Sequence, residues 1–187
     1  MSILFTERLV LEPITLPMVE AVMGGRREDA ERIAEARLPA AWPGRALVER
    51  AFTVSLEQIR TNPAVRLWGD RLMILRDPQT NERRVIGSVV FHGKPDAEGM
   101  AEVAYGVEEG SQGQGLATEA TRASVEWALA QPEVRFVTAT TLPWHVASLR
   151  VIEKCGMKRV GTREHDMLGE LLVFGITNSQ FEIAINL

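Results

Sequence analysis

The sequence contains little of the material from which covalent cross-links, metal centres or membrane spans are built. Its 187 residues include one cysteine, Cys155, so no disulfide can form within the chain. The three histidines are widely spaced, which leaves poor material for a zinc site. No apolar run approaches the roughly 18 residues of a membrane-spanning helix, and Glu7 and Arg8 interrupt the stretch that a signal peptide would need. We therefore expect a cytoplasmic protein that binds no metal and no membrane.

Basic residues are also too few for a nucleic-acid-binding protein. Twenty-one Lys and Arg residues against 25 Asp and Glu residues leave a formal charge of −4. Domains that bind nucleic acid are usually basic, whereas a slightly acidic chain suits a cationic partner such as an amine. The hydrophobic fraction of 45% and the charged fraction of 25% are close to globular averages. This length and composition predict one domain over residues 1–187.

The hydrophobic pattern predicts a mixed architecture of helices and strands. A strand-like segment, 3–14, precedes a charged helical region, 16–37, that Gly24 and Gly25 interrupt. Further helices are expected over residues 46–61, 115–130 and 146–155. Strands are expected over residues 72–76, 85–91, 102–107, 134–141, 158–164 and 170–176, the first three as an antiparallel meander. This order of elements predicts an α/β or α+β fold with a mixed sheet.

The most informative segment is AYGVEEGSQGQGLATEATRASVEWALAQP, residues 104–132. A strand ends at Val107, a loop with three glycines follows, and an amphipathic helix begins near Gly115. Glycine permits positive φ and lets a phosphate approach the backbone. A helix N-terminus presents unpaired N–H groups and a partial positive charge. The junction therefore predicts an anion site.

Two common phosphate-binding motifs do not fit this loop. A dinucleotide fingerprint needs glycine or alanine where Thr118 stands, and it needs a preceding parallel βαβ unit, which a meander does not supply. A Walker loop needs a lysine after its glycines, and none follows here. A nucleotide-binding module that uses the same loop stays open as a weaker alternative.

The pattern Gln112-x-x-Gly115-x-Ala117 resembles the Gln/Arg-x-x-Gly-x-Gly/Ala pyrophosphate loop of the GNAT superfamily of acetyl-CoA-dependent N-acetyltransferases. TERLVLEPIT near the start and EVAYGV before the loop are similar to the family's opening strand and to the strand preceding that loop. HVASLRVIEKCGM is similar to the Asn-x-Ala-Ser-x-Arg-Val-x-Glu-Lys-x-Gly-Phe segment of the ribosomal-protein (Rim-type) branch. The resemblance extends from Thr6 to Val160 in the family's order.

The resemblance implies a fold and a cosubstrate. The fold would be a mixed, mostly antiparallel sheet of six to seven strands, splayed between its fourth and fifth strands, with about four helices. Strand 102–107 would part from strand 134–141 to admit the pantetheine arm of acetyl-CoA, and a backbone N–H would hold the thioester carbonyl. The implied cofactor-binding residues are Val107, Gln112, Gly113, Gln114, Gly115, Leu116, Ala117, Thr118 and His145.

Ser148 is the implied proton donor to the leaving thiolate. It is a hydroxyl on an otherwise apolar face of helix 146–155, where it could also bond back to its own helix. In the family, this position matches a serine proposed to hydrogen-bond the coenzyme sulfur. Many members carry a tyrosine as general acid where this chain has Ile152, which favours Ser148, or a water that it positions, in that role.

Three other side chains, those of His145, Tyr105 and Cys155, lie in or near these motifs. His145 stands where the branch usually has asparagine, and its imidazole can still donate or accept a hydrogen bond. Tyr105, the only tyrosine, lies in the strand before the loop and is interpreted as a core residue. Cys155, a lone cysteine on an apolar helix face, is interpreted as core rather than as a nucleophile.

The acceptor side is less well determined by the sequence. Glu102 is the first candidate for the general base that accepts the amine proton, and Asp166 is the second; surface solvation explains either residue equally well. Trp42 lies on the proline-rich loop 38–44 between two predicted N-terminal helices, which flank the acceptor side in the family. It is our candidate acceptor-binding residue, with a core role as the alternative.

These features together predict an acetyl-CoA-dependent N-acetyltransferase that transfers the acetyl group directly to an amine in a ternary complex. The acceptor is either a protein N-terminal α-amine or a small-molecule amine, and a homodimer stays open. The alternative from another class is a non-catalytic acyl-CoA-binding sensor with the same fold.

Overall fold

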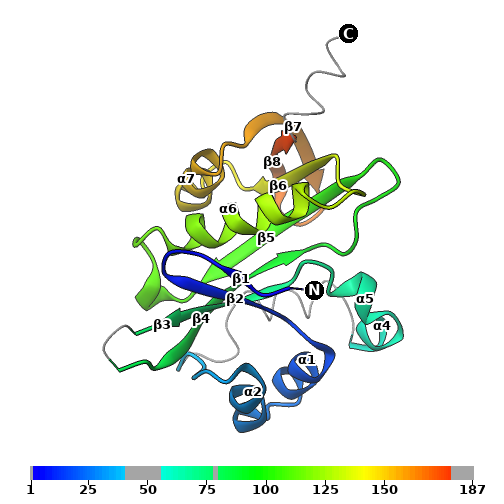
Figure 1. Ribbon diagram of the computed structural model, residues 1–187. Helices are drawn as coiled ribbons and strands as arrows, with labels where there is room; N and C mark the ends of the chain where they lie inside the picture. Colours follow the sequence, from blue (N-terminus) through cyan, green and yellow to red (C-terminus); the bar gives the residue numbers. More distant parts are fainter. Residues whose placement is uncertain (1, 41–55, 78–79, 178–187) are drawn as a thin grey trace.

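Eight strands form a mixed sheet in the order β1-β2-β3-β4-β5-β6-β8-β7 (Figure 1). The structure is a computed structural model, and it describes residues 2–40, 56–77 and 80–177. The strands are β1 (Leu4–Phe5), β2 (Leu9–Pro13), β3 (Arg71–Arg76), β4 (Arg83–Phe91), β5 (Met100–Val107), β6 (Phe136–Thr141), β7 (Lys158–His165) and β8 (Gly169–Thr177). Every neighbouring pair is antiparallel except β5 and β6, which are parallel.

The described part of the chain contains six α-helices and one short 3₁₀ turn. They are α1 (Leu16–Met23), α2 (Arg27–Ala34), α4 (Leu56–Thr61), α5 (Pro63–Arg66), η1 (Glu109–Ser111), α6 (Leu116–Leu129) and α7 (Val146–Lys154). The described segments include no helix that is both long enough and apolar enough to span a membrane. Trp42 and the first ten residues of the predicted helix 46–61 lie outside the described residues.

The predicted mixed sheet and the β3–β4–β5 meander are confirmed, whereas the predicted numbers of strands and helices were too low. The segment 3–14 forms two strands because a turn at residues 6–8, closed by the Thr6 N–H on the Leu9 carbonyl at 3.0 Å, folds β1 back onto β2. Pro63 begins α5 as a separate helix, since proline has no N–H and fits a first helical turn. The glycine pair divides the first helical region into α1 and α2, as expected.

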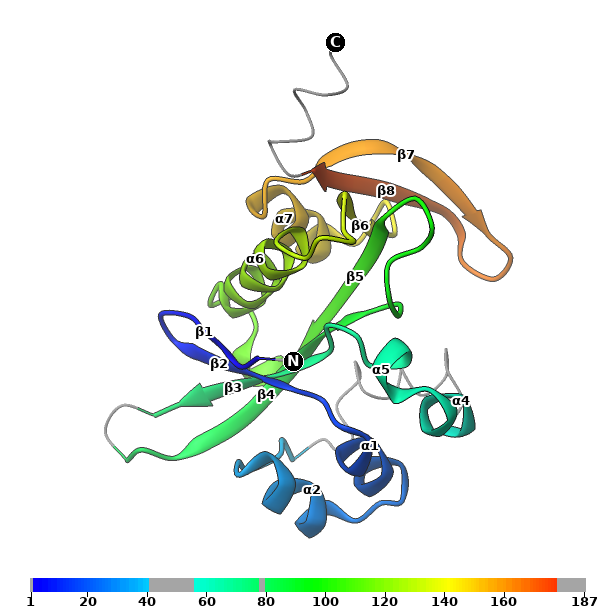
Figure 2. The ribbon, with the colours of Figure 1, turned by 45° about the vertical axis from the view of Figure 1, so that its right-hand side comes forward.

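Helices cover both faces of the sheet, as Figures 1 and 2 show. Alternate side chains of a strand point to opposite faces, and β5 follows this rule closely. Ala101, Val103 and Tyr105 pack in the hydrophobic core that includes α6 and α7. Ala104 packs in the other core, beneath α1 and α2. We call the side of the sheet that carries the first core the α6 face, and the side that carries the second core the α1 face.

Aromatic contacts dock the C-terminal half of α6 on the sheet. The Trp127 ring on α6 lies 5.0 Å from the Trp68 ring and 6.2 Å from the Phe91 ring, between centroids. The buried guanidinium of Arg71 stacks 4.0 Å from the centroid of Trp127. Burial lowers the pKa of Arg71 to about 10, and the nearby Asp70 carboxylate opposes that shift. These contacts fix the axis of the helix whose N-terminus closes the glycine loop.

The parallel pair β5 and β6 separates after three residue pairs. Met100, Ala101 and Glu102 pair with Phe136, Val137 and Thr138, and no pairing follows. Beyond this point β5 continues beside β4, and β6 continues beside β8. The predicted splay between two neighbouring strands is therefore confirmed. It lies between the fifth and sixth strands rather than the fourth and fifth, because β1 is an additional strand at the start of the order.

Candidate active site

The loop between β5 and α6 has the backbone of an anion site. Gly113 and Gly115 have φ values of +74° and +79°, in the left-handed region that side chains other than glycine's rarely adopt. Gly115 is the N-cap of α6. A Cβ on Gly113 would meet no atom within 4 Å, and one on Gly115 would meet only Arg8, at 3.6 Å. Both glycines are therefore required by conformation rather than by crowding.

The N–H groups of this loop are available, while several of its carbonyls are occupied. No backbone N–H from Gly113 to Thr118 has a hydrogen-bond partner among the described residues. The side-chain amides of Gln112 and Gln114 donate to the carbonyls of Val107 and Gly110, at 3.0 and 3.3 Å. A row of free donors at a helix N-terminus favours a phosphate or diphosphate. Gln112 and Gln114 thus stabilise the conformation of the loop through its carbonyls and leave its N–H groups free.

The parted edge of β5 adds free backbone groups to this row, although the N–H groups of Glu108, Ser111 and Gln112 between the two parts are bonded. His92 donates its N–H to the Glu102 carbonyl at 3.0 Å, and Glu108 donates to the Ile86 carbonyl at 2.8 Å. In an antiparallel pair the bonded residues alternate, so the backbone groups of Val103, Tyr105 and Val107 turn away from β4 and toward β6. The last bridge of the β5–β6 pair, Glu102 with Thr138, engages the Val103 N–H, and the Val107 carbonyl accepts from Gln112. The groups that face the gap are therefore those of Tyr105 and the N–H of Val107.

On the α6 face of the gap, Tyr105 and Ser148 form a hydroxyl pair. The Tyr105 Oη lies 3.0 Å from the Ser148 Oγ and 3.1 Å from the Ser148 carbonyl oxygen. Burial raises the pKa of Tyr105 to about 12, and the bond to Ser148 only partly offsets this, so the phenol stays protonated at neutral pH. The sequence predicted a core role for Tyr105. Its ring does pack on the core, but its hydroxyl has a polar partner that sequence reasoning missed.

On the α1 face, Glu102 is held by several donors. Thr140 donates to its Oε1 at 2.8 Å, Arg163 donates to both carboxylate oxygens at 3.1 and 3.2 Å, and the His92 Nδ1 lies 3.6 Å from its Oε2. Burial raises the pKa of Glu102, but His92, Arg163 and Thr140 together outweigh burial and bring the pKa down to about 2. A carboxylate with such a pKa is a weak proton acceptor at neutral pH.

The remaining predicted residues occupy distinct positions. His145 is exposed at the N-cap of α7, with its ring centroid 6.1 Å from that of Trp144. Asp166 is exposed at the turn between β7 and β8. Ile152 and Cys155 are buried, as predicted, and burial raises the pKa of the Cys155 thiol to about 11, which keeps it protonated.

A cavity of about 480 Å³ lies elsewhere, between β2, α1, α2 and α5. Its lining includes Glu12, Met18 and Ile33, and it shares no residue with the glycine loop or with the gap between β5 and β6. Among the residues that the structure describes, no cluster of histidine, cysteine and carboxylate side chains could hold a metal ion. The glycine loop thus offers backbone donors for a diphosphate, and the Tyr105–Ser148 pair offers hydroxyls for proton transfer.

A family model and known proteins match this chain. The family model described as an acetyltransferase (GNAT) domain matches residues 8–158. An uncharacterised N-acetyltransferase of Bacillus subtilis (strain 168), YjdG, is 25% identical over 158 residues, which are 83% of this chain and 89% of YjdG.

Solved structures show the same fold at low identity. A GNAT-family acetyltransferase from Bacillus anthracis superposes with a TM-score of 0.61 at 20% identity, covering 94% of this chain and 98% of that one. RimL, a ribosomal L7/L12 α-N-protein acetyltransferase solved with coenzyme A, superposes with a TM-score of 0.62 at 15% identity, with coverage of 94% and 98%.

The contacts of Glu102 predict a pH-dependent contribution to stability. Because its pKa in the folded chain, about 2, lies below the ordinary value of 4.5, the contribution is complete above about pH 4.5 and is lost as the pH falls toward 2. Glu102→Gln should therefore lower the free energy of unfolding by up to about 3 kcal/mol at pH 7 and by less than half as much at pH 3. Urea unfolding at both pH values measures this.

Glu164→Gln, at an exposed position of β7, is the matched control and should be as stable as the parent at both pH values. Equal destabilisation of the Glu102 variant at pH 7 and pH 3 would contradict the assigned contacts.

Proposed function

We propose that this chain, which belongs to the acetyltransferase (GNAT) domain family, transfers an acetyl group from acetyl-CoA directly to a primary amine. The observation that carries the proposal is an interrupted row of unpaired backbone donors. It comprises the N–H groups of Tyr105 and Val107 at the gap beside β5 and, beyond the bonded N–H groups of Glu108, Ser111 and Gln112, those from Gly113 to Thr118. A diphosphate joined to an extended arm that ends in a thioester has the chemistry that this row recognises.

The cosubstrate would lie along that row. The N–H groups from Gly113 to Thr118 would hold the diphosphate, and Gln112 and Gln114 would keep the loop in shape through their bonds to carbonyls. The edge of β5 at Tyr105 and Val107 would bind the pantetheine arm and the thioester oxygen. His145, at the start of α7, is proposed as a further contact from the opposite side of the gap.

The hydroxyl pair on the α6 face would serve the leaving thiolate. The amine nitrogen bonds to the acetyl carbon, the C–S bond breaks, and the leaving thiolate takes a proton from the Ser148 hydroxyl. Tyr105, bonded to Ser148 at 3.0 Å, would pass a proton to the Ser148 oxygen and regain one from water. The proton released by the amine passes to water, because Glu102, paired with Arg163 on the other face, is a weak proton acceptor.

Because Glu102 is a weak base, the site favours acceptor amines of modest basicity. An α-amine with a pKa of about 8 is partly neutral near pH 7.5, whereas a lysine side chain near 10.4 needs a stronger base than the strongly acidic Glu102 carboxyl supplies. We therefore propose an α-amine acceptor, either a protein N-terminus or a small molecule. RimL, by its description, is an α-N-protein acetyltransferase, which supports the first of these.

Two measurements test the proposed function. Calorimetry with acetyl-CoA, ATP and NAD should show binding of acetyl-CoA alone. Release of free thiol should then be measured across peptides with a free N-terminus, Nα-acetyl-lysine and small α-amines, with the α-amines reacting fastest. Binding without thiol release from any amine would indicate the acyl-CoA sensor, and preferential binding of ATP or NAD would indicate a nucleotide-binding module.

The first variant prediction concerns the glycine loop. Gly115→Ala should weaken acetyl-CoA binding by about tenfold or more, because alanine resists the +79° φ that aims the adjacent N–H groups. Gly110→Ala is the matched control, since Gly110 has no positive φ and a Cβ there meets no atom within 4 Å. Calorimetry on both variants decides the matter, and equal affinities would remove the loop from the cosubstrate site.

The second variant prediction concerns the hydroxyl pair. Ser148→Ala should lower kcat by about 100-fold, the lower end of general acid catalysis, with little change in melting temperature because alanine favours a helix. Tyr105→Phe keeps the packed ring and should lower kcat by about tenfold. Both should bind acetyl-CoA as the parent does, and a kcat within twofold of the parent in the Ser148 variant would leave that residue a structural role only.

A further inference from the structure

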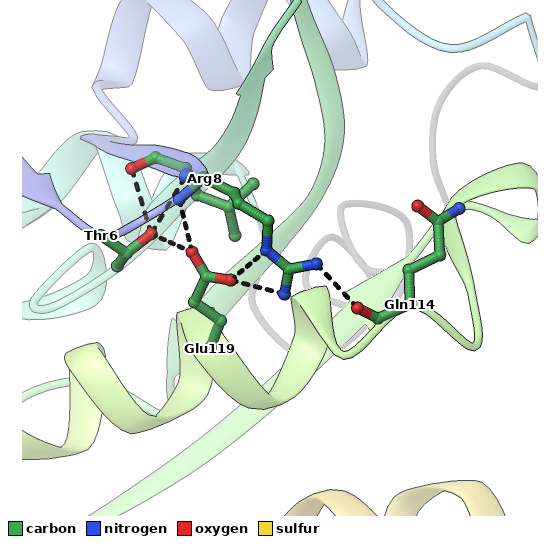
Figure 3. Close-up of polar contacts among 5 residues, drawn as sticks. Thr6, Arg8, Gln114 and Glu119 are labelled. Atoms are coloured by element: carbon green, nitrogen blue, oxygen red, sulfur yellow. Dashed lines mark hydrogen bonds and ion pairs between the residues drawn. The ribbon is translucent and has the colours of Figure 1, made fainter.

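Glu119, in the first turns of α6, is the centre of a polar cluster that joins the start of the chain to the glycine loop (Figure 3). Thr6 donates its hydroxyl to the Glu119 Oε1 at 2.6 Å, and the Arg8 backbone N–H donates to the same oxygen at 2.8 Å. The Arg8 Nε donates to the Glu119 Oε2 at 2.7 Å, and the Arg8 Nη2 lies 2.6 Å from it. Both carboxylate oxygens are thus satisfied by the turn between β1 and β2.

The same guanidinium also reaches the glycine loop. The Arg8 Nη1 donates to the Gln114 carbonyl at 2.9 Å, and the Arg8 Nη2 lies 3.6 Å from the position of a Cβ on Gly115. Arg8 therefore contacts the peptide group that links Gln114 to Gly115, in the middle of the row of free N–H donors. A cation on a peptide oxygen polarises that peptide and makes its N–H a stronger donor.

Arg8 also offsets the negative charge of the Glu119 carboxylate. Burial opposes its charged form, but the bonds from Thr6 and Arg8 outweigh burial, so the pKa of Glu119 lies below its usual value and the carboxylate is anionic. An anion at a helix N-terminus stabilises the helix, but here it lies beside a site that is to bind another anion. Without Arg8 the two negative charges would repel each other across a partly desolvated surface.

We propose that Arg8 is a positioning residue for the diphosphate of acetyl-CoA, acting by neutralising Glu119 and by fixing the Gln114–Gly115 peptide. This inference rests on the proposed function, because it takes the glycine loop as the diphosphate site. It assigns the TERL segment, more than 100 residues from the loop along the chain, to cosubstrate binding.

Arg8→Gln should raise the Kd and the KM for acetyl-CoA about tenfold, with kcat at saturation unchanged. Arg8→Lys keeps the charge but loses the forked contact, so its Kd should lie between those of Arg8→Gln and the parent. Glu119→Gln should bind acetyl-CoA at least as tightly as the parent, and the double variant should recover most of the affinity that Arg8→Gln loses.

A truncated thioester separates this role from general support of the fold. S-Acetylpantetheine carries the thioester and the arm but no diphosphate, so its kcat/KM should be the same, within about twofold, in Arg8→Gln and the parent. Arg60→Gln is the matched control: it breaks an ion pair between α4 and α1, Arg60 Nε to Glu20 Oε1 at 2.7 Å, remote from the loop. Its Kd for acetyl-CoA should equal that of the parent.

Three results would overturn the inference: an unchanged Kd in Arg8→Gln, an equal loss of kcat/KM with both thioesters, or a Glu119→Gln variant weakened as much as Arg8→Gln. Where Arg8→Gln does not fold, Arg8→Lys and Glu119→Gln provide the same test: the Kd of the first should be higher than that of the parent, and the Kd of the second should be equal or lower. Failure of the parent to bind acetyl-CoA at all is a different outcome, which removes the proposed function itself.

Discussion

The separation of β5 from β6 after Glu102 is the constraint on which the rest of the structure depends. A strand edge inside a sheet normally has its N–H and C=O groups paired, yet β5 turns the groups of Tyr105 and the N–H of Val107 toward a neighbour that has moved away. The sheet tolerates this because β4 and β8 pair the outer edges of the two strands. The chain then passes through the bonded turn at residues 108–112 into the glycine loop and α6, so free donors occur both at the strand edge and at the helix N-terminus.

Near that row, three carboxylates are paired with arginines, although the chain as a whole is acidic. The carboxylates of Glu102 on β5, of Glu108 just after it and of Glu119 on α6 each have an arginine partner: Arg163, Arg84 and Arg8 respectively. Each pair brings a distant segment of the chain against β5 or its loop. The formal charge of −4 therefore says little about the potential at the site, because these three carboxylates near the row of donors are neutralised locally.

The two faces of the sheet separate a protonated hydroxyl pair from an ionised carboxylate. Tyr105 and Ser148 lie on the face covered by α6 and α7, where burial keeps the phenol protonated. Glu102, Thr140, His92 and Arg163 form the polar group on the other face, where hydrogen bonds keep the carboxylate ionised. A strand whose side chains alternate between faces places an acid and an anion on opposite sides of the same gap without any special loop.

The sequence by itself determined the elements and the loop. Periodicity and turn residues located the meander, α6, α7 and the last hairpin, and the spacing of Gln112, Gly115 and Ala117 identified the loop and its family, because these signals are local. The chemistry of individual side chains depends on partners far along the chain. Only the tertiary structure joined Arg8 to Glu119, gave Tyr105 a hydroxyl partner in Ser148, and surrounded Glu102 with donors that make it a poor base. Hydrogen bonds and ion pairs act over a few ångströms in space, and no pattern along one chain specifies which distant residues will lie that close.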